Sequence, residues 1–267
     1  MVHGLEGSSQ AGYAQSAAQA GLSAGFAVHR FNMRSCGGTE AFSGRTLYHS
    51  GQTEDLLSVA VQMASEGRGP IFLVGYSLGG NVVLKLAGEL GSSGRHLISG
   101  VCAVSTPIDL AACVEQLGKP WNVLYARRFL RRLKERVMRK ELLCPGSFAI
   151  GRMDHVRTVY DFDDVFTAAS FGFGSADRYY ATQSSNQFLE DIRVPALLIQ
   201  AKDDPLIPFR VYDHPAFGRN GRLELTATEH GGHVGYLCRG PSRFWLDERI
   251  IEWLNKVGNK AAANCVS

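Results

Sequence analysis

A serine with a glycine two positions before it and another two positions after it, in the segment 75–79, constrains this chain more than any other feature. Four apolar residues at 71–74 precede it and predict a buried strand, and residues 80–87 predict a helix directly after it. A strand that turns so sharply into a helix needs small residues around the central serine. The hydroxyl group of Ser77 then stands at a helix N-terminus, where backbone dipoles favour developing negative charge. The segment therefore predicts an α/β fold in which Ser77 is a nucleophile.

Strand and helix patterns alternate along most of the chain. Helical stripes of apolar residues fall at offsets of three and four, one in the segment 57–64 and one in the segment 246–257. Strands and helices in alternation predict a mostly parallel sheet flanked by helices. The predicted strands are residues 26–31, 71–75, 101–105, 196–201 and 223–226.

The alternation stops between residues 107 and 185, where the sequence becomes helical and basic and then aromatic. Strand patterning resumes near residue 194. We interpret residues 107–185 as a cap inserted into a single domain that spans residues 1–267, because this segment lacks the pattern of an independent core.

A serine hydroxyl group needs a base and a carboxylate that orients the base. Asp204 follows the predicted strand 196–201 and is the favoured carboxylate, with Asp203 as the alternative. His233 is the favoured base because two glycines before it let its loop fold over the serine, and His230 is the alternative. The chain order serine, aspartate, histidine is the order expected of an α/β-hydrolase.

An oxyanion also needs backbone donors. The N–H group of Leu78 follows the nucleophile directly, and a glycine-rich loop at residues 3–9 could present the N–H group of Leu5. We therefore predict Leu5 and Leu78 as the oxyanion hole.

Composition excludes several other classes of protein. Hydrophobic residues make up 45% of the 267 residues and charged residues 20%, which is typical of a globular protein. The sequence contains no apolar run near the roughly 20 residues of a membrane-spanning helix and no signal-peptide pattern at its start. The six cysteines are scattered without a C-x-x-C pair, so we expect buried thiols in the cytoplasm, no metal site and no cofactor.

The net charge of +3 is distributed unevenly. Residues 127–140 contain eight basic residues and one acid, a net charge of +7, which leaves 20 basic against 24 acidic residues, or −4, elsewhere. Phe129, Leu130, Leu133 and Val137 form an apolar stripe, so we expect a cap helix with a solvated basic face. Contact with an anionic membrane surface is an open alternative for this helix. No motif that would indicate nucleic-acid binding accompanies the charge. The sequence does not specify an oligomeric state.

Taken together, these motifs resemble the YheT-like (ABHD-type) branch of the α/β-hydrolases. The resemblance implies that Ser77, Asp204 and His233 form the charge-relay system. It also implies hydrolysis of carboxylic esters, with glycerol or phospholipid esters among the substrates. The matching stretches are residues 3–9, 32–38, 48–51, 75–81, 203–205 and 230–235, with residues 162–164 and 172–173 in the cap.

Two departures from this family pattern have structural consequences. Ser35 replaces a usual glycine, and only Met1 and Val2 precede the His-Gly motif, where the family carries two strands and most of a third. If the chain begins at an internal methionine, its N-terminal strands are missing and the sheet has a gap beside Leu73, with unpaired backbone groups.

The sequence thus predicts a serine carboxylesterase or lipase-like hydrolase that acts on a small-molecule ester or lipid through an acyl-enzyme. Two alternatives stay open. One is an impaired or non-catalytic protein of the same fold, and the other is an acyltransferase or peptidase with the same triad.

Overall fold

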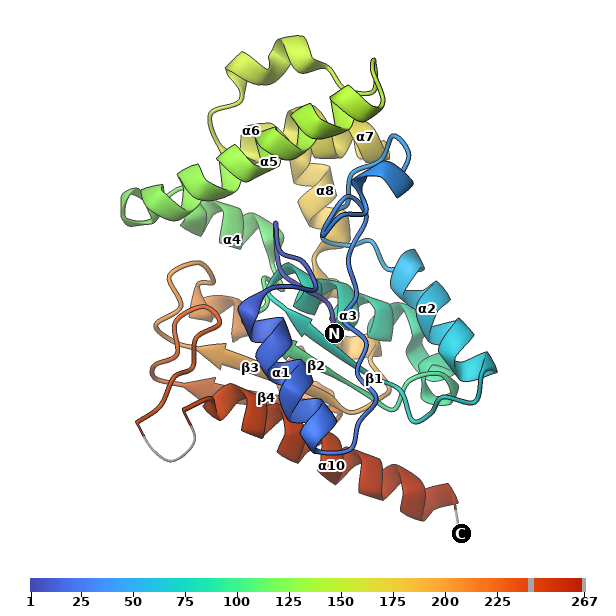
Figure 1. The fold of residues 1–267 in the computed structure, drawn as a ribbon. Coiled ribbons are helices and arrows are strands. Elements are labelled where there is room, and N and C mark those ends of the chain that lie inside the picture. The colour runs from blue at the N-terminus through green and yellow to red at the C-terminus, as the bar shows by residue number, and fades with distance from the viewer. Residues whose placement is uncertain (240–242, 266–267) are drawn as a thin grey trace.

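Four parallel strands form the centre of the molecule (Figure 1). The computed structural model describes residues 1–239 and 243–265, with only the backbone described for residues 260–265. The strands lie side by side in chain order, with β2 and β3 in the middle, and this arrangement confirms the predicted α/β fold. Their bounds are Phe72–Tyr76 for β1, Gly100–Val104 for β2, Ala196–Ala201 for β3 and Leu223–Thr228 for β4.

Helices cover both faces of this sheet, because alternate residues of the buried strands point to opposite sides. On one face, α1 (Gly12–Ser23) and α10 (Trp245–Cys265) pack against Val74, Cys102 and Leu197. On the other face, α2 (Glu54–Ser65) and α3 (Leu78–Leu90) pack against the neighbouring strand residues, such as Val101 and Leu198. A short helix, α9 (Ala216–Arg219), precedes β4.

Of the two predicted helical stripes, one is confirmed and one is shifted. Leu246, Ile250, Trp253 and Val257 are all buried in α10. In α2 the buried residues are Leu56 and Ala60, whereas Val61 of the predicted stripe is 50% exposed. Leu56, Ala60 and the half-buried Met63 fit the helical period equally well, and tertiary packing selects that face.

The prediction of a strand over residues 26–31 is wrong. Only Phe31 pairs, in a single parallel bridge to Val2, and Val2 in turn bridges to Gly75 in β1. The N–H group of Val2 donates to the carbonyl of Val74 at 2.8 Å, and that of Tyr76 donates to the carbonyl of Val2 at 3.0 Å. Val2 therefore lies between Phe31 and β1, and within the described residues no other segment pairs with that edge of the sheet.

Residues 107–185 contribute no strand and form a group of helices beyond the ends of β1–β3 (Figure 1). Asn81, in the first turn of α3, joins this group to the sheet. Its side-chain amide donates to the carbonyls of Ser50 and Gln183, each at 2.8 Å, and accepts from the N–H group of Ser185. The helices of the group are α4 (Leu110–Leu117), α5 (Val123–Leu143), α6 (Val159–Phe162), α7 (Ala168–Phe171) and α8 (Ala176–Gln183).

The basic segment 127–140 lies within α5, and its apolar stripe packs inward as predicted. The expectation of a fully solvated basic face needs correction, because Arg136 and Lys140 are buried. Arg136 forms an ion pair with Glu6, and the ammonium group of Lys140 donates to the carbonyls of Glu40 and Gly44. The N-terminal third of the chain supplies these acceptors, which the sequence pattern of α5 alone cannot reveal.

Three of the cysteines, Cys36, Cys102 and Cys113, are buried as thiols. Burial raises the pKa of the Cys36 thiol to about 12, so this group stays protonated and unreactive at neutral pH. The side chain of Cys265 lies outside the described residues. No helix in the described part of the chain is both long enough and apolar enough to cross a membrane.

Candidate active site

Ser77 occupies the sharp turn between β1 and α3, with φ of 52° and ψ of −122°. A Cβ atom on Gly75 would lie 2.2 Å from the carbonyl oxygen of Gly79, and one on Gly79 would lie 2.5 Å from the carbonyl oxygen of Val2. The turn therefore closes only with glycine at both positions. This close packing fixes Ser77 in a left-handed backbone conformation that few non-glycine residues adopt.

The structure brings Ser77, His233 and Asp204 together at the carboxyl ends of β1, β4 and β3. The Nε2 atom of His233 lies 2.9 Å from the Ser77 Oγ atom. The Nδ1 atom of His233 lies 2.9 Å and 3.2 Å from the two carboxylate oxygens of Asp204. With Nδ1 protonated and facing the carboxylate, Nε2 is left to accept the serine proton.

The carboxylate of Asp204 is held on several sides. Its side chain is fully buried, and Oδ1 accepts from the N–H groups of Leu206 and Ile207 at 2.9 Å and 3.2 Å. The amide of Gln200, at the end of β3, donates to Oδ2 at 3.1 Å. Gln200 in turn accepts a hydrogen bond from the hydroxyl group of Tyr212. These bonds fix the carboxylate orientation, and the sequence gives no clear signal for the parts played by Gln200 and Tyr212.

The alternative residues, Asp203 and His230, form a second pair at the surface. The Nδ1 atom of His230 lies 3.2 Å from the Asp203 carboxylate, but the His230 side chain is 90% exposed. The N–H group of Gly232 donates to Asp203 at 2.8 Å, and this bond lowers the pKa of the Asp203 carboxyl group. Asp203 thus holds the loop that carries His233.

Leu5 and Leu78 both lie against Ser77. A Cβ atom on Gly4 would approach the Ser77 Cβ atom to 3.0 Å, so the 3–9 loop contacts the sharp turn at Ser77, called the elbow below. The N–H groups on either side of Leu5 are engaged, that of Gly4 by the Tyr13 hydroxyl and that of Glu6 by the Tyr48 hydroxyl. Among the described residues the N–H groups of Leu5 and Leu78 have no acceptor, so both are available to an oxyanion.

A buried ion pair supports this loop. Glu6 adopts a positive φ of 56° and accepts two hydrogen bonds from the Arg136 guanidinium group, at 2.8 Å and 2.9 Å. The Tyr48 hydroxyl donates to the Glu6 carboxylate at 3.0 Å. Burial lowers the pKa of His3, whose neutral ring joins the Gly4 carbonyl to the Met33 N–H group. The sequence missed Glu6 and Arg136 as positioning residues, because the two lie 130 positions apart.

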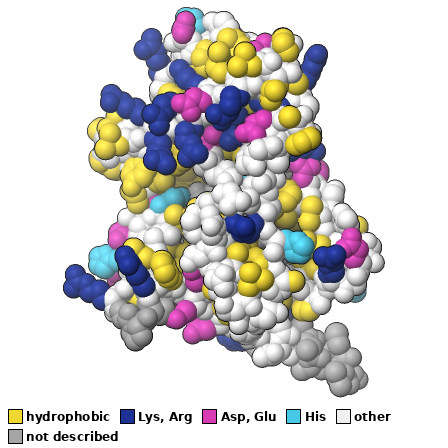
Figure 2. Space-filling model, in the orientation of Figure 1, with side chains coloured by type: hydrophobic (Ala, Val, Ile, Leu, Met, Phe, Trp, Pro, Cys, Tyr) yellow, Lys and Arg dark blue, Asp and Glu magenta, His cyan; other side chains and the backbone are white. Residues whose placement is uncertain are grey.

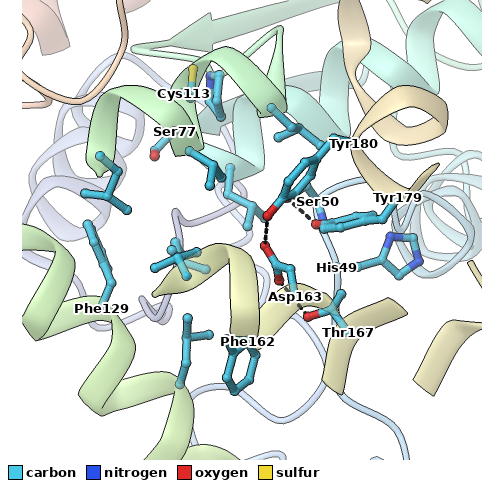
Figure 3. Close-up of a pocket in the computed structure, with 18 of the residues that line it drawn as sticks. His49, Ser50, Ser77, Cys113, Phe129, Phe162, Asp163, Thr167, Tyr179 and Tyr180 are labelled. Atoms are coloured by element: carbon cyan, nitrogen blue, oxygen red, sulfur yellow. Dashed lines mark hydrogen bonds between the residues drawn. The ribbon is translucent and has the colours of Figure 1, made fainter. Parts of the chain in front are cut away.

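An apolar cavity opens beside Ser77 under the helices of residues 107–185 (Figure 3). Its walls are mostly aliphatic and aromatic, and polar groups gather around Asp163 (Figure 3). The Asp163 carboxylate accepts hydrogen bonds from the hydroxyl groups of Tyr180 and Thr167, each at 2.7 Å. Burial raises the pKa of the Asp163 carboxyl group to about 6. The apolar walls include Leu47, Leu110, Val114, Leu117, Phe129, Leu133, Val159 and Phe162.

The described residues include no cluster of three or more histidine, cysteine, aspartate or glutamate side chains that could hold a metal ion.

Comparisons with known proteins agree with this fold and show the family. Residues 1–241 match the model of the alpha/beta hydrolase family. The Escherichia coli K12 protein named "Putative esterase YheT" is 36% identical over 260 residues, which cover 95% of this chain and 75% of that protein. "Phospholipase ABHD3" of Mus musculus is 28% identical and matches 89% of this chain. This chain spans 57% of the length of that mouse protein and 65% of a Dictyostelium discoideum relative.

Solved structures agree with the fold. The esterase Pf2001 of Pyrococcus furiosus superposes with a TM-score of 0.60 at 18% identity, covering 96% of this chain and 81% of that one. A monoacylglycerol lipase of Paleococcus ferrophilus gives 0.57 at 19% identity, covering 96% and 93%.

A parallel sheet flanked by helices, with a serine at the strand–helix elbow, defines the class of α/β hydrolases. The chain belongs to the alpha/beta hydrolase family. Within that family it groups with the YheT-like (ABHD-type) proteins and is similar to esterases and lipases.

Proposed function

We propose that this protein hydrolyses carboxylic esters by acyl transfer through Ser77. His233 takes the proton of the serine hydroxyl while Oγ attacks the ester carbonyl carbon. The tetrahedral intermediate then expels the alcohol, which takes the proton from His233, and the acyl group stays on Ser77. Water, deprotonated by His233, attacks this acyl-enzyme and releases the carboxylic acid, and Ser77 regains its proton.

The observation that carries the proposal is the hydrogen-bonded chain from Ser77 through His233 to Asp204. Its distances of 2.9 Å at both steps suit proton transfer at one end and orientation of the imidazole at the other. The buried Asp204 carboxylate would keep Nδ1 protonated and would stabilise the imidazolium that forms during attack.

Two further features support the proposal. The N–H groups of Leu5 and Leu78, without acceptors among the described residues, would stabilise the oxyanion. The apolar cavity beside Ser77 suits an acyl chain, and residues 107–185 would act as the cap that excludes water from it. Relatives named esterase, phospholipase and lipase favour esters over amides as substrates.

Hydrolysis of p-nitrophenyl butyrate by the purified chain tests the proposal. We expect measurable turnover by the wild type and a loss of about 10⁴-fold or more in kcat for Ser77→Ala. Ser58→Ala is the matched control, because Ser58 is exposed on α2 and is not among the residues that line the cavity beside Ser77. Equal turnover by the wild type and Ser77→Ala would refute the assignment, and no turnover by either would favour a non-catalytic role.

An alcohol can replace water in the second half of the reaction. One relative, of Saccharomyces cerevisiae, is named "Medium-chain fatty acid ethyl ester synthase/esterase 2" and is 26% identical. Adding ethanol to the same assay and measuring the amounts of ethyl butyrate and butyrate distinguishes acyl transfer to the alcohol from hydrolysis. A hydrolase releases mainly butyrate, and an acyltransferase mainly the ethyl ester.

A further inference from the structure

Helix α5 carries two rows of basic side chains. Arg128, Arg132, Arg136 and Arg139 follow one another at intervals of four, four and three residues, so they share one side of the helix. Arg127 and Arg131 precede them by one position and lie along an outer surface groove. Figure 2 shows Lys and Arg side chains gathered over this part of the molecule.

The first row lines a cleft that reaches the catalytic serine. The cleft runs between α5 and the 4–8 loop, and Ser77 and His233 also line it. Leu5, Phe129 and Arg136 border both this cleft and the apolar cavity. Ser77 therefore stands where an apolar space and a basic space meet.

Most of the positive charge in the cleft is not neutralised. Arg136 is buried and paired with Glu6, so its charge is balanced. Arg128, Arg132 and Arg139 are exposed and form no hydrogen bond or ion pair with the described residues. Glu40 is the one other acidic residue among those that line the cleft.

An ester bound at Ser77 has two unlike parts. The acyl chain is apolar and fits the cavity, whereas the alcohol must leave with the proton of His233, which also lines the cleft. An anionic group on the alcohol would meet arginine guanidinium groups there, which bind phosphate and carboxylate with two hydrogen bonds each.

We propose that the cleft between α5 and the 4–8 loop binds an anionic group on the alcohol side of the substrate. The substrate class is then an acyl ester whose leaving alcohol carries a phosphate or carboxylate group. Arg128 and Arg132 are the specificity residues of this subsite. The inference rests on the proposed function, since it names the substrate of the same serine.

Three soluble esters with one acyl chain test it: hexanoylglycerol, hexanoylglycerol 3-phosphate and the hexanoyl ester of glycolate. We measure the ratio of kcat/KM for each anionic ester to that for the neutral one. In Arg128→Gln/Arg132→Gln this ratio should fall about tenfold to thirtyfold, mainly through KM. The matched control Arg127→Gln/Arg131→Gln, on the outer row of the same helix, should keep the wild-type ratio.

The pattern of losses identifies the anion. If the kcat/KM ratio falls for both anionic esters, the cleft is a general anion subsite. If it falls for one ester alone, that ester carries the group that the site selects. The wild-type ratio should also decline as salt is added, because the arginines are exposed. An unchanged ratio in the cleft variant, or an equal fall in the outer-row control, would overturn the proposal.

Binding without catalysis separates this inference from the proposed function. Calorimetric titration with hexyl phosphate should give a Kd at least tenfold weaker for the cleft variant and unchanged for the control. Such binding without ester turnover would refute the proposed function alone. If hexyl phosphate binds all three proteins equally, while vesicles containing phosphatidylserine bind both double variants more weakly, the arginines serve a membrane surface and the subsite is refuted.

Discussion

The loops after β3 and β4 hold two aspartate–histidine pairs, Asp204–His233 and Asp203–His230, whose surroundings differ. In one pair, Asp204 is buried, and His233 reaches Ser77 at 2.9 Å. In the other pair, Asp203 is partly exposed and His230 projects almost fully into solvent. The residue types are the same in both pairs, and the sequence separations are similar, 29 positions in the first pair and 27 in the second.

The difference lies in what surrounds each carboxylate. Asp204 accepts hydrogen bonds from two backbone N–H groups and from Gln200, so it can hold one imidazole in a fixed orientation. Asp203 bonds to the backbone of Gly232 and to the exposed side chain of His230, where solvent screens the ion pair. Burial and fixed partners therefore distinguish the pair that we propose as catalytic from the pair at the surface.

Replacing each histidine by alanine should give the largest contrast. We expect His233→Ala to lower kcat for a neutral ester by about 10⁴-fold to 10⁶-fold, because Ser77 loses its base. His230→Ala should stay within about threefold of the wild type, because an exposed pair contributes little. Comparable losses in the two variants would show that the catalytic base is misassigned.

Replacing each aspartate by asparagine should give the next largest contrast. Asp204→Asn keeps the shape of the side chain but favours the wrong imidazole tautomer, and we expect a loss of about 10⁴-fold in kcat. Asp203→Asn should lower kcat less than tenfold, by loosening the loop held through Gly232. Steady-state kinetics with p-nitrophenyl butyrate measures kcat for the two variants. A larger loss in Asp203→Asn than in Asp204→Asn would make Asp203 the carboxylate that orients the base.

Two arginine ion pairs show the same contrast between a buried and an exposed pair. Arg136→Gln leaves the Glu6 carboxylate buried without its cation, and we expect the free energy of unfolding to fall by about 3–5 kcal/mol. Arg34→Gln removes an exposed pair with Asp55 and should lower it by less than about 1 kcal/mol. Urea unfolding of both variants measures the difference. Equal effects would mean that burial does not govern the contribution of ion pairs here.

Asp163 is a half-buried carboxylate that accepts hydrogen bonds from hydroxyl groups rather than from an imidazole. Burial raises the pKa of its carboxyl group to about 6, above the usual value near 4, so folding favours the protonated form. Its stabilising contribution is present below about pH 4 and is lost as pH rises through 6. Asp163→Asn cannot ionise, so the stability of this variant relative to the wild type should be roughly 1–3 kcal/mol higher at pH 7 than at pH 4. A difference that stays constant with pH would contradict the assigned titration.

The sequence predicted the elements around the site well, because their signals are local. The elbow at Ser77 depends on glycine two positions before and after it, and the strand before it is a short apolar run between turn residues. The loops that carry Asp204 and His233 follow the ends of predicted strands, so topology alone brings them to one edge of the sheet. The oxyanion hole formed by the N–H groups of Leu5 and Leu78 stays a prediction.

What the sequence could not predict depends on contacts between distant segments. Residues 26–31 have the composition of a strand, but they lack a partner along most of their length, and Phe31 alone pairs with Val2. From the sequence alone, Arg136 is indistinguishable from the exposed arginines of the same basic helix. Its ion pair with Glu6, which lies far away in the sequence, becomes evident only in the structure. Likewise, whether Asp203 or Asp204 is the carboxylate that orients the base depends on burial, which the sequence alone does not reveal.

Covalent labelling tests the central claim of this account most directly. The purified chain is treated with a fluorophosphonate probe, and peptide mass spectrometry locates the adduct. We expect one adduct per chain, on Ser77, fast in the wild type and in His230→Ala and strongly slowed in His233→Ala, because the imidazole must take the serine proton. An adduct on another residue, or labelling of Ser77→Ala at the wild-type rate, would contradict the assignment of Ser77 as the nucleophile.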